Sequence, residues 1–121
     1  MNTFETSGGF ERLDVYRAAI EFAGLGHELD SKIERKNEEL GKQLNRAMVS
    51  IVLNIGEGAG KTKPRDKARF YAIARGSACE SVAVFDLLHT FQIITDDDHT
   101  RGKQLLHRII AMLTRLCHSA Q

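Results

Sequence analysis

The chain has 121 residues, of which 42% are hydrophobic and 27% charged, so it has the length and composition of one folded domain with a core. It shows neither a signal-peptide pattern nor a run of 18 uncharged apolar residues, so we expect neither secretion nor membrane spanning. Its formal net charge of +1 does not by itself indicate a nucleic-acid-binding protein.

The first predicted helix runs from about Leu13 to Leu29, after an expected flexible tail of residues 1–9; residues 10–121 form a single domain. This first helix carries two apolar rows with helical spacing: Leu13, Tyr16, Ile20 and Ala23 in one, and Val15, Ala19, Phe22 and Leu29 in the other. A bundle core needs one row, so the second indicates burial against another subunit; a helix buried deeply in its own monomer is the alternative. Gly24 and Gly26 each cost about 1 kcal/mol in a helix interior, so this helix is expected to kink or end near them.

The stretch "LNIGEGAGKTK", residues 53–63, has the look of a phosphate-binding loop. Such a loop, G-x-x-x-x-G-K-[ST], would need its first glycine at the position of Ile55. A helix is predicted instead, because apolar residues follow steps of three and four: Leu40, Leu44, Ala47, Ile51 and Ile55. Gly58 and Gly60 then end this helix, and Thr62 and Pro64 begin the next. A nucleotide-binding enzyme using Gly56 to Thr62 is therefore the least favoured function.

The third predicted helix shows an a/d heptad pattern: Phe70, Ala74, Ser77, Ser81, Val84, Leu88 and Phe91. Thr95 is the predicted N-cap of the fourth helix, which buries Leu106, Ile109, Leu113 and Leu116. Short turns make consecutive helices antiparallel neighbours. The sequence therefore predicts an all-α, antiparallel, up-down-up-down four-helix bundle.

Polar residues follow one another beside the apolar stripe of the second helix and recur on the third. They are Gln43, Arg46, Ser50, Asn54, Glu57 and, on the third helix, Ser77 and Glu80. Antiparallel pairing predicts ion pairs from Arg46 to Glu80 and from Glu57 to Arg65 or Arg69, while Asn54 and Ser77 bond each other or the backbone. The alternative is that these carboxylates do chemistry or hold a metal. No Glu-x-x-His, HxxxH or nucleophile and base spacing supports it, so no catalytic residue, cofactor, metal or small-molecule substrate is expected.

Basic residues are concentrated between positions 61 and 75 and in a seven-residue stripe further on. The candidate nucleic-acid-binding residues are Lys61, Lys63, Arg65, Lys67, Arg69 and Arg75, with Arg101, Arg108 and Arg115. The alternative is a solvated surface whose bases pair with local acids. Cys79 and Cys117 lack CxxC spacing, which indicates reduced, buried packing residues in a cytoplasmic protein.

The segments "QLNRAMVSIVLNIGEGAGK" and "FYAIARGSACES" resemble the family of four-helix bundle proteins. Its members include proteins encoded within intervening sequences of bacterial large-subunit (23S) ribosomal RNA genes, and the chain is also similar to the accessory variability proteins of diversity-generating retroelements. The matching residues are Gln43, Arg46, Ala47, Ser50, Asn54, Ile55, Glu57, Gly58, Gly76, Ser77 and Glu80. An N-terminal motif, "FERLDVYRAA", also fits, so the likeness extends from Phe10 to about Leu116.

The resemblance implies an antiparallel four-helix bundle that assembles as a ring-shaped homopentamer. The retroelement relatives bind nucleic acid and a reverse transcriptase through basic surface. Here Gly56 replaces the usual alanine, a charged "SKIERKNEE" replaces a proline-containing turn, and the strongly basic balance is absent. The leading hypothesis is a non-enzymatic, oligomeric adaptor or accessory protein with RNA, DNA and a reverse transcriptase as candidate partners. The alternative is a purely structural or protein-partner module that does not bind nucleic acid.

Overall fold

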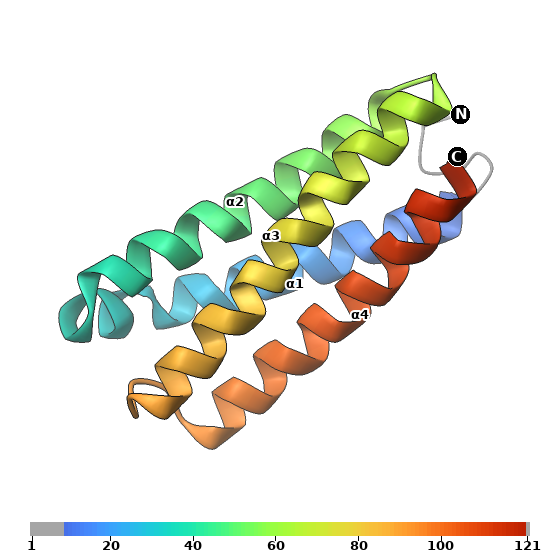
Figure 1. The fold of residues 1–121 in the computed structure, drawn as a ribbon. Helices are drawn as coiled ribbons and strands as arrows, with labels where there is room; N and C mark the ends of the chain where they lie inside the picture. Colours follow the sequence, from blue (N-terminus) through green and yellow to red (C-terminus); the bar gives the residue numbers. More distant parts are fainter. Residues whose placement is uncertain (1–8, 121) are drawn as a thin grey trace.

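Four α-helices make up the computed structural model, which describes residues 9–120 (Figure 1). They are α1 (Gly9–Lys36), α2 (Glu38–Gly60), α3 (Pro64–Thr90) and α4 (Asp96–Ala120). Helices α1 and α3 each pack against both α2 and α4, so α1 and α3 are diagonal to each other. No strand occurs between residues 9 and 120, and the predicted all-α antiparallel bundle is confirmed. The predicted tail, residues 1–9, lies outside the described residues except for Gly9, which begins α1.

The core consists largely of the helix faces that the sequence periodicity identifies. On α3 the predicted row is wrong at Phe91, which is 53% exposed, and it omits Tyr71 and Phe85, which are buried. On α4, Leu106, Ile109 and Leu113 are fully buried. On α1 the buried row is the one that contains Val15, Ala19, Phe22 and Leu29. Ile20, from the other row, remains 47% exposed, so α1 is not enclosed on all sides by its own monomer.

Helix α1 continues through Gly24 and Gly26 to Lys36, so the predicted end near these glycines is wrong. Gly26 is buried against α2, where an added Cβ would lie 2.1 Å from the sulfur of Met48. The helix continues through most of the charged segment to Lys36, and the single residue Asn37 links it to α2. The Asn37 side chain accepts a hydrogen bond from the Leu40 amide at 3.1 Å, which caps α2.

Helix α2 ends at Gly60, as predicted, but Gly56 and Gly58 lie inside it, so the glycine-rich stretch as a whole is not the turn. The turn is formed by Lys61 to Lys63 alone, and α3 begins at Pro64. Glycine ends a helix where the chain needs a positive φ, and none of these three adopts one. The glycine-rich segment is therefore the last turn of a helix and not a loop.

The link between α3 and α4 follows a Schellman motif without glycine. Gln92 has a φ of 59°, its amide donates to the His89 carbonyl, and the Ile93 amide donates to the Leu88 carbonyl at 2.8 Å. Thr95 Oγ1 then accepts from the Asp98 amide at 3.1 Å, so its predicted capping role is confirmed.

Both cysteines are free. Cys117 is partly buried, and burial raises the pKa of its thiol. Cys79 is exposed, so the prediction of a buried packing residue is wrong for this position, which lies on the outer face of α3.

Asp86 on α3 holds the start of α4 through two side chains. Its Oδ1 accepts from Lys103 Nζ at 2.7 Å and lies 2.9 Å from His99 Nε2. The His99 ring stacks on His89 with centroids 4.0 Å apart, and His89 Nε2 lies 2.7 Å from Asp96 Oδ1. The hydrogen bonds from Lys103 and His99 lower the pKa of Asp86 from its ordinary value of 3.8.

We expect Asp86→Asn to lower stability near neutral pH and to lose that effect in acid. A lowered folded-state pKa means that the carboxylate stabilises the fold above pH 3.8, and this contribution disappears as the pH falls through the folded-state pKa. Urea unfolding of both proteins from neutral pH down to about pH 2 measures the difference. A difference in the free energy of unfolding that stays constant over this range would contradict the assignment.

Candidate functional site

A polar seam joins α2 to α3 and consists of Gln43, Arg46, Ser50, Asn54, Ser77 and Glu80. The predicted ion pair is present, with Arg46 Nη2 3.2 Å from Glu80 Oε2, and the same nitrogen donates to Gln43 Oε1. The side chains of Arg46 and Glu80 are 67% and 41% exposed, so water screens the pair and it contributes at most about 1 kcal/mol.

Two hydroxyl groups and an amide form the more protected half of the polar seam. Ser50 Oγ and Ser77 Oγ lie 2.7 Å apart and share a hydrogen bond. Asn54 Nδ2 donates to the Ser50 carbonyl at 2.8 Å and to Ser50 Oγ at 3.2 Å. Of the two predicted arrangements, a bond to Ser77 or a bond to the backbone, Asn54 therefore adopts the second. An axial shift of α3 along α2 would leave these partly buried groups without partners, so they help to set the register of the two helices.

Glu57 and Gly58 have roles that differ from those predicted. Glu57 Oε2 pairs with Lys61 Nζ at 3.7 Å, so the predicted pairing with Arg65 or Arg69 is wrong. Lys61 follows the last residue of α2 and is only four residues from Glu57, so it is the nearer base. Gly58 is buried beneath the ring of Tyr71, and a Cβ at position 58 would lie 2.7 Å from Tyr71 Cε1. The glycine therefore permits the close packing of α2 and α3.

The Lys67 side chain forms hydrogen bonds within the bundle. Its Nζ donates to the carbonyl oxygens of Gly58 at 3.3 Å and Ala59 at 3.2 Å, which satisfies acceptors at the end of α2. Burial lowers the pKa of Lys67, and the nearby charge of Arg12 lowers it further. Lys67 therefore serves the turn between α2 and α3 and is poorly placed to contact a phosphate.

Three further candidate bases also have partners. Lys61 and Arg69 both lie over the ring of Phe70, 5.2 Å and 5.1 Å from its centroid. Arg75 Nε donates to Thr114 Oγ1 on α4 at 2.7 Å. Neither ring stacking nor this hydrogen bond removes a positive charge, so these residues still add to the local potential.

The stripe of Arg101, Arg108 and Arg115 follows α4 beside α1 and is largely paired. Arg101 lies 3.7 Å from Glu28, and Arg115 lies 2.9 Å from Glu11. Because α1 and α3 are diagonal, the stripe and the basic run on α3 occupy different faces. Arg101 and Arg108 therefore do not join the basic run in one patch, and only Arg115 lies at the end of the bundle where that run begins.

One end of the bundle has a positive charge. The start of α1, the turn between α2 and α3, and the end of α4 meet there (Figure 1). Its segments, residues 9–16, 54–72 and 114–120, contain seven lysines and arginines against four acids, a net charge of +3; we call it the basic end. Lys63 and Arg65 are exposed there, and within residues 9–120 their side chains have no hydrogen bond or ion pair.

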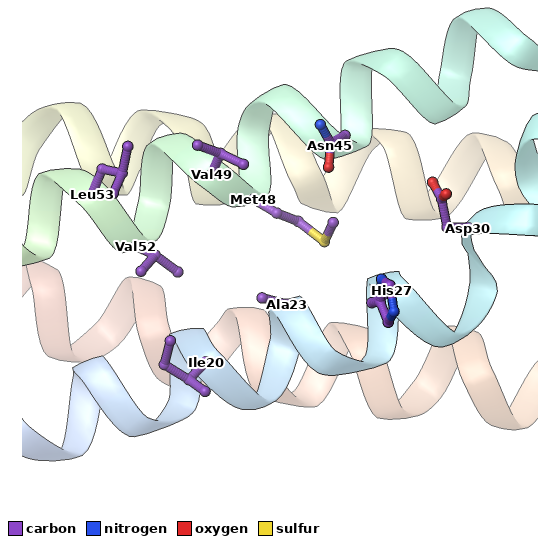
Figure 2. Close-up of a pocket in the computed structure, with 10 residues that line it drawn as sticks. Ile20, Ala23, His27, Asp30, Asn45, Met48, Val49, Val52 and Leu53 are labelled. Atoms are coloured by element: carbon purple, nitrogen blue, oxygen red, sulfur yellow. The ribbon is translucent and has the colours of Figure 1, made fainter.

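An apolar groove of about 360 Å³ lies between α1 and α2. Figure 2 shows its apolar side chains, which are Ile20, Ala23, Met48, Val49, Val52 and Leu53. Ile20 and Val49 are each 47% exposed and Leu53 is 61% exposed. Large aliphatic side chains that gather in an exposed concave patch are typical of an interaction surface.

The sequence pattern predicts that one of the two apolar rows of α1 contacts another subunit, but it does not indicate which row. The row that lines this groove contains Ile20 and Ala23, and the pattern did not single out Val49 and Leu53. The signal was present, because these two residues are four apart and belong to neither the core row nor the polar seam of α2.

Within residues 9–120, no group of three or more His, Cys, Asp or Glu side chains is placed to hold a metal ion. The described helices also contain no segment with the length and hydropathy needed to cross a membrane.

The fold and its surfaces define a four-helix bundle module with a polar seam, a basic end and an open apolar groove. The family model for 23S rRNA-intervening sequence proteins matches residues 11–115. The chain therefore belongs to the 23S rRNA-intervening sequence protein family, which confirms this part of the resemblance. Comparison with curated proteins found no match.

Proposed function

We propose that the protein is a non-enzymatic assembly module whose copies associate through the apolar groove between α1 and α2. The observation that carries this proposal is the exposure of Ile20, Val49 and Leu53 in one groove. Covering these side chains removes apolar surface from water, which contributes about 25 cal/mol for each Å² buried.

A second copy of the chain is a suitable partner for the groove, because α1, α2 and α3 each expose an apolar residue at the same height along the long axis of the bundle. Leu53 and Ile73 lie two helical turns from the contacting pair of Arg46 and Glu80, in the same direction along the bundle. They therefore stand level with each other, and Ile73 is 45% exposed. Ile20 lies level with Leu53, since the contact of Gly26 with Met48 sets the register of α1 and α2.

We call Ile20, Val49, Leu53 and Ile73 the apolar band. A copy rotated about an axis parallel to the bundle carries its own apolar band at the same height. Apolar surface then meets apolar surface, as a closed assembly of identical chains requires.

We expect Leu53→Asp to convert the assembled protein to a monomer. A carboxylate in the apolar half of the groove would be desolvated on association, which should weaken the association constant more than about 100-fold. Analytical ultracentrifugation measures the mass against the 13.5 kDa of one chain. Phe91→Asp changes another exposed apolar residue, at the far turn, and should leave the mass unchanged. A monomeric wild-type protein, or a Leu53→Asp protein that assembles normally, would refute the proposal.

The second candidate function is binding of nucleic acid at the basic end. It is favoured by the exposed side chains of Lys63 and Arg65, which have no partner among residues 9–120 and lie close in sequence to Lys61 and Arg69. Phosphates attract such bases, and each neutralised phosphate releases a counterion, so affinity falls as salt rises.

Affinity for a single-stranded RNA oligonucleotide should fall steeply between about 50 and 200 mM NaCl. It should weaken about tenfold or more in the double variant Lys63→Glu with Arg65→Glu. Arg108→Glu is the matched control, since it reverses an exposed base on another face. Fluorescence anisotropy measures the affinity. If it detects no binding of the RNA at low salt, the proposed nucleic-acid binding is refuted and only protein partners remain.

A further inference from the structure

Charge is distributed unevenly along the long axis of the bundle. The basic end has a net charge of +3, as described above. The opposite end, residues 27–46 and 80–103, holds the two other turns (Figure 1). It contains ten acids against seven lysines and arginines, a net charge of −3. The orientation of neighbouring copies therefore decides whether unlike or like ends lie side by side.

The apolar groove is uneven along the same axis. Ile20 and Leu53 lie in its half nearer the basic end, whereas His27, Asp30 and Asn45 line the other half (Figure 2). Antiparallel copies that meet across this groove would bring Asp30 of one onto Leu53 of the other. Burying a carboxylate against aliphatic groups is costly.

Parallel copies avoid that cost. Rotation about an axis parallel to the bundle keeps every residue at its own height, so the apolar band meets the apolar band and Asp30 stays at a polar level. The same rotation places all basic ends on one face of the assembly and all acidic ends on the other. Like charges repel across such contacts over about 10 Å at 0.1 M salt.

We propose that assembly of this protein and binding of nucleic acid to the basic end are coupled, each strengthening the other. The inference rests on the proposed association through the groove. A phosphate chain that lies across several basic ends cancels their mutual repulsion and is held by several copies at once. Because coupling between two binding equilibria is reciprocal, the nucleic acid strengthens assembly by the same factor as assembly strengthens nucleic-acid binding.

The test measures self-association of the full-length protein by sedimentation velocity at several salt concentrations, with and without a single-stranded RNA oligonucleotide. Without RNA, the association constant should rise between about 50 and 300 mM NaCl, because salt screens the repulsion between like ends. At the lower salt, RNA should raise it about tenfold.

A charge-reversal variant separates the two orientations. Lys63→Glu with Arg65→Glu changes the basic end from +3 to −1. In parallel copies this relieves repulsion, so association without RNA strengthens at low salt while the response to RNA is lost. In antiparallel copies the same change removes attraction and weakens association.

Leu53→Asp separates failure of the coupling from failure of the interface. If the wild type associates through Leu53 but dissociates as salt rises, the copies are antiparallel and the coupling is refuted while the groove interface stands. If Leu53→Asp leaves assembly unchanged, the groove interface and the coupling are both refuted. A Leu53→Asp monomer that binds RNA about tenfold more weakly than the wild type supports the coupling.

Discussion

Replacing Gly102 with alanine should destabilise the bundle by about 2 to 3 kcal/mol, a large effect for one methyl group. A Cβ at position 102 would lie 2.1 Å from Cε2 and 2.5 Å from Cδ2 of Phe85. The Phe85 ring is fully buried and packs against Phe22 with ring centroids 5.4 Å apart. Because the ring has no free space to enter, α4 must move away from α3.

Chemical denaturation followed by circular dichroism measures this loss, and Gly26→Ala is the matched control. The Cβ added there also lies 2.1 Å from a neighbour, but that neighbour is the sulfur of Met48, which is flexible and borders the open groove. The control should therefore lose less than about 1 kcal/mol. Phe85→Leu combined with Gly102→Ala should be less destabilising than the sum of the single changes. Additive losses would contradict the proposed steric cause.

Alanine at positions 56 and 58 should change stability in opposite directions. Gly56 is exposed within α2 and a Cβ there meets no atom within 4 Å, so Gly56→Ala should stabilise by up to about 1 kcal/mol. At Gly58 the Cβ would lie 2.7 Å and 2.9 Å from atoms of the Tyr71 ring, and Tyr71 is only 1% exposed. Gly58→Ala should therefore destabilise by about 1 to 2 kcal/mol even though alanine favours a helix.

Thermal and urea unfolding of the two variants side by side tests this contrast. Tyr71→Leu in the Gly58→Ala background removes the ring and should reduce the additional loss caused by the methyl group. If both alanine variants stabilise α2 equally, the Tyr71 ring does not require a glycine beneath it.

The helical pattern was predictable because each core face repeats with the period of the helix. Leu106, Ile109 and Leu113 illustrate this, since all three are fully buried at spacings of three and four. The polar seam was also largely predictable. Antiparallel pairing about a short turn brought Arg46 to Glu80, and this required only the approximate position of the turn.

The helix ends were not predictable from glycine alone. Gly24 and Gly58 both look like helix breakers in the sequence, yet each lies within a helix, one exposed and the other beneath an aromatic ring. Conversely, α3 ends at Thr90 and Gln92, two residues later, has a positive φ, a position where glycine is the usual signal. Whether a glycine ends a helix or lies inside it depends on how the neighbouring helix packs against it, and the sequence alone does not show that packing.

The sequence by itself determined the number of helices, their antiparallel order, their core faces and the family of the chain, because these depend on local periodicity and residue identity. Only the tertiary structure decided which surfaces remain open. It placed Leu53 and Val49 beside Ile20 in one groove, paired Arg101 and Arg115 with acids of α1, and left Lys63 and Arg65 exposed. These outcomes depend on which side chains from distant segments meet, and that is settled by the register and rotation of packed helices.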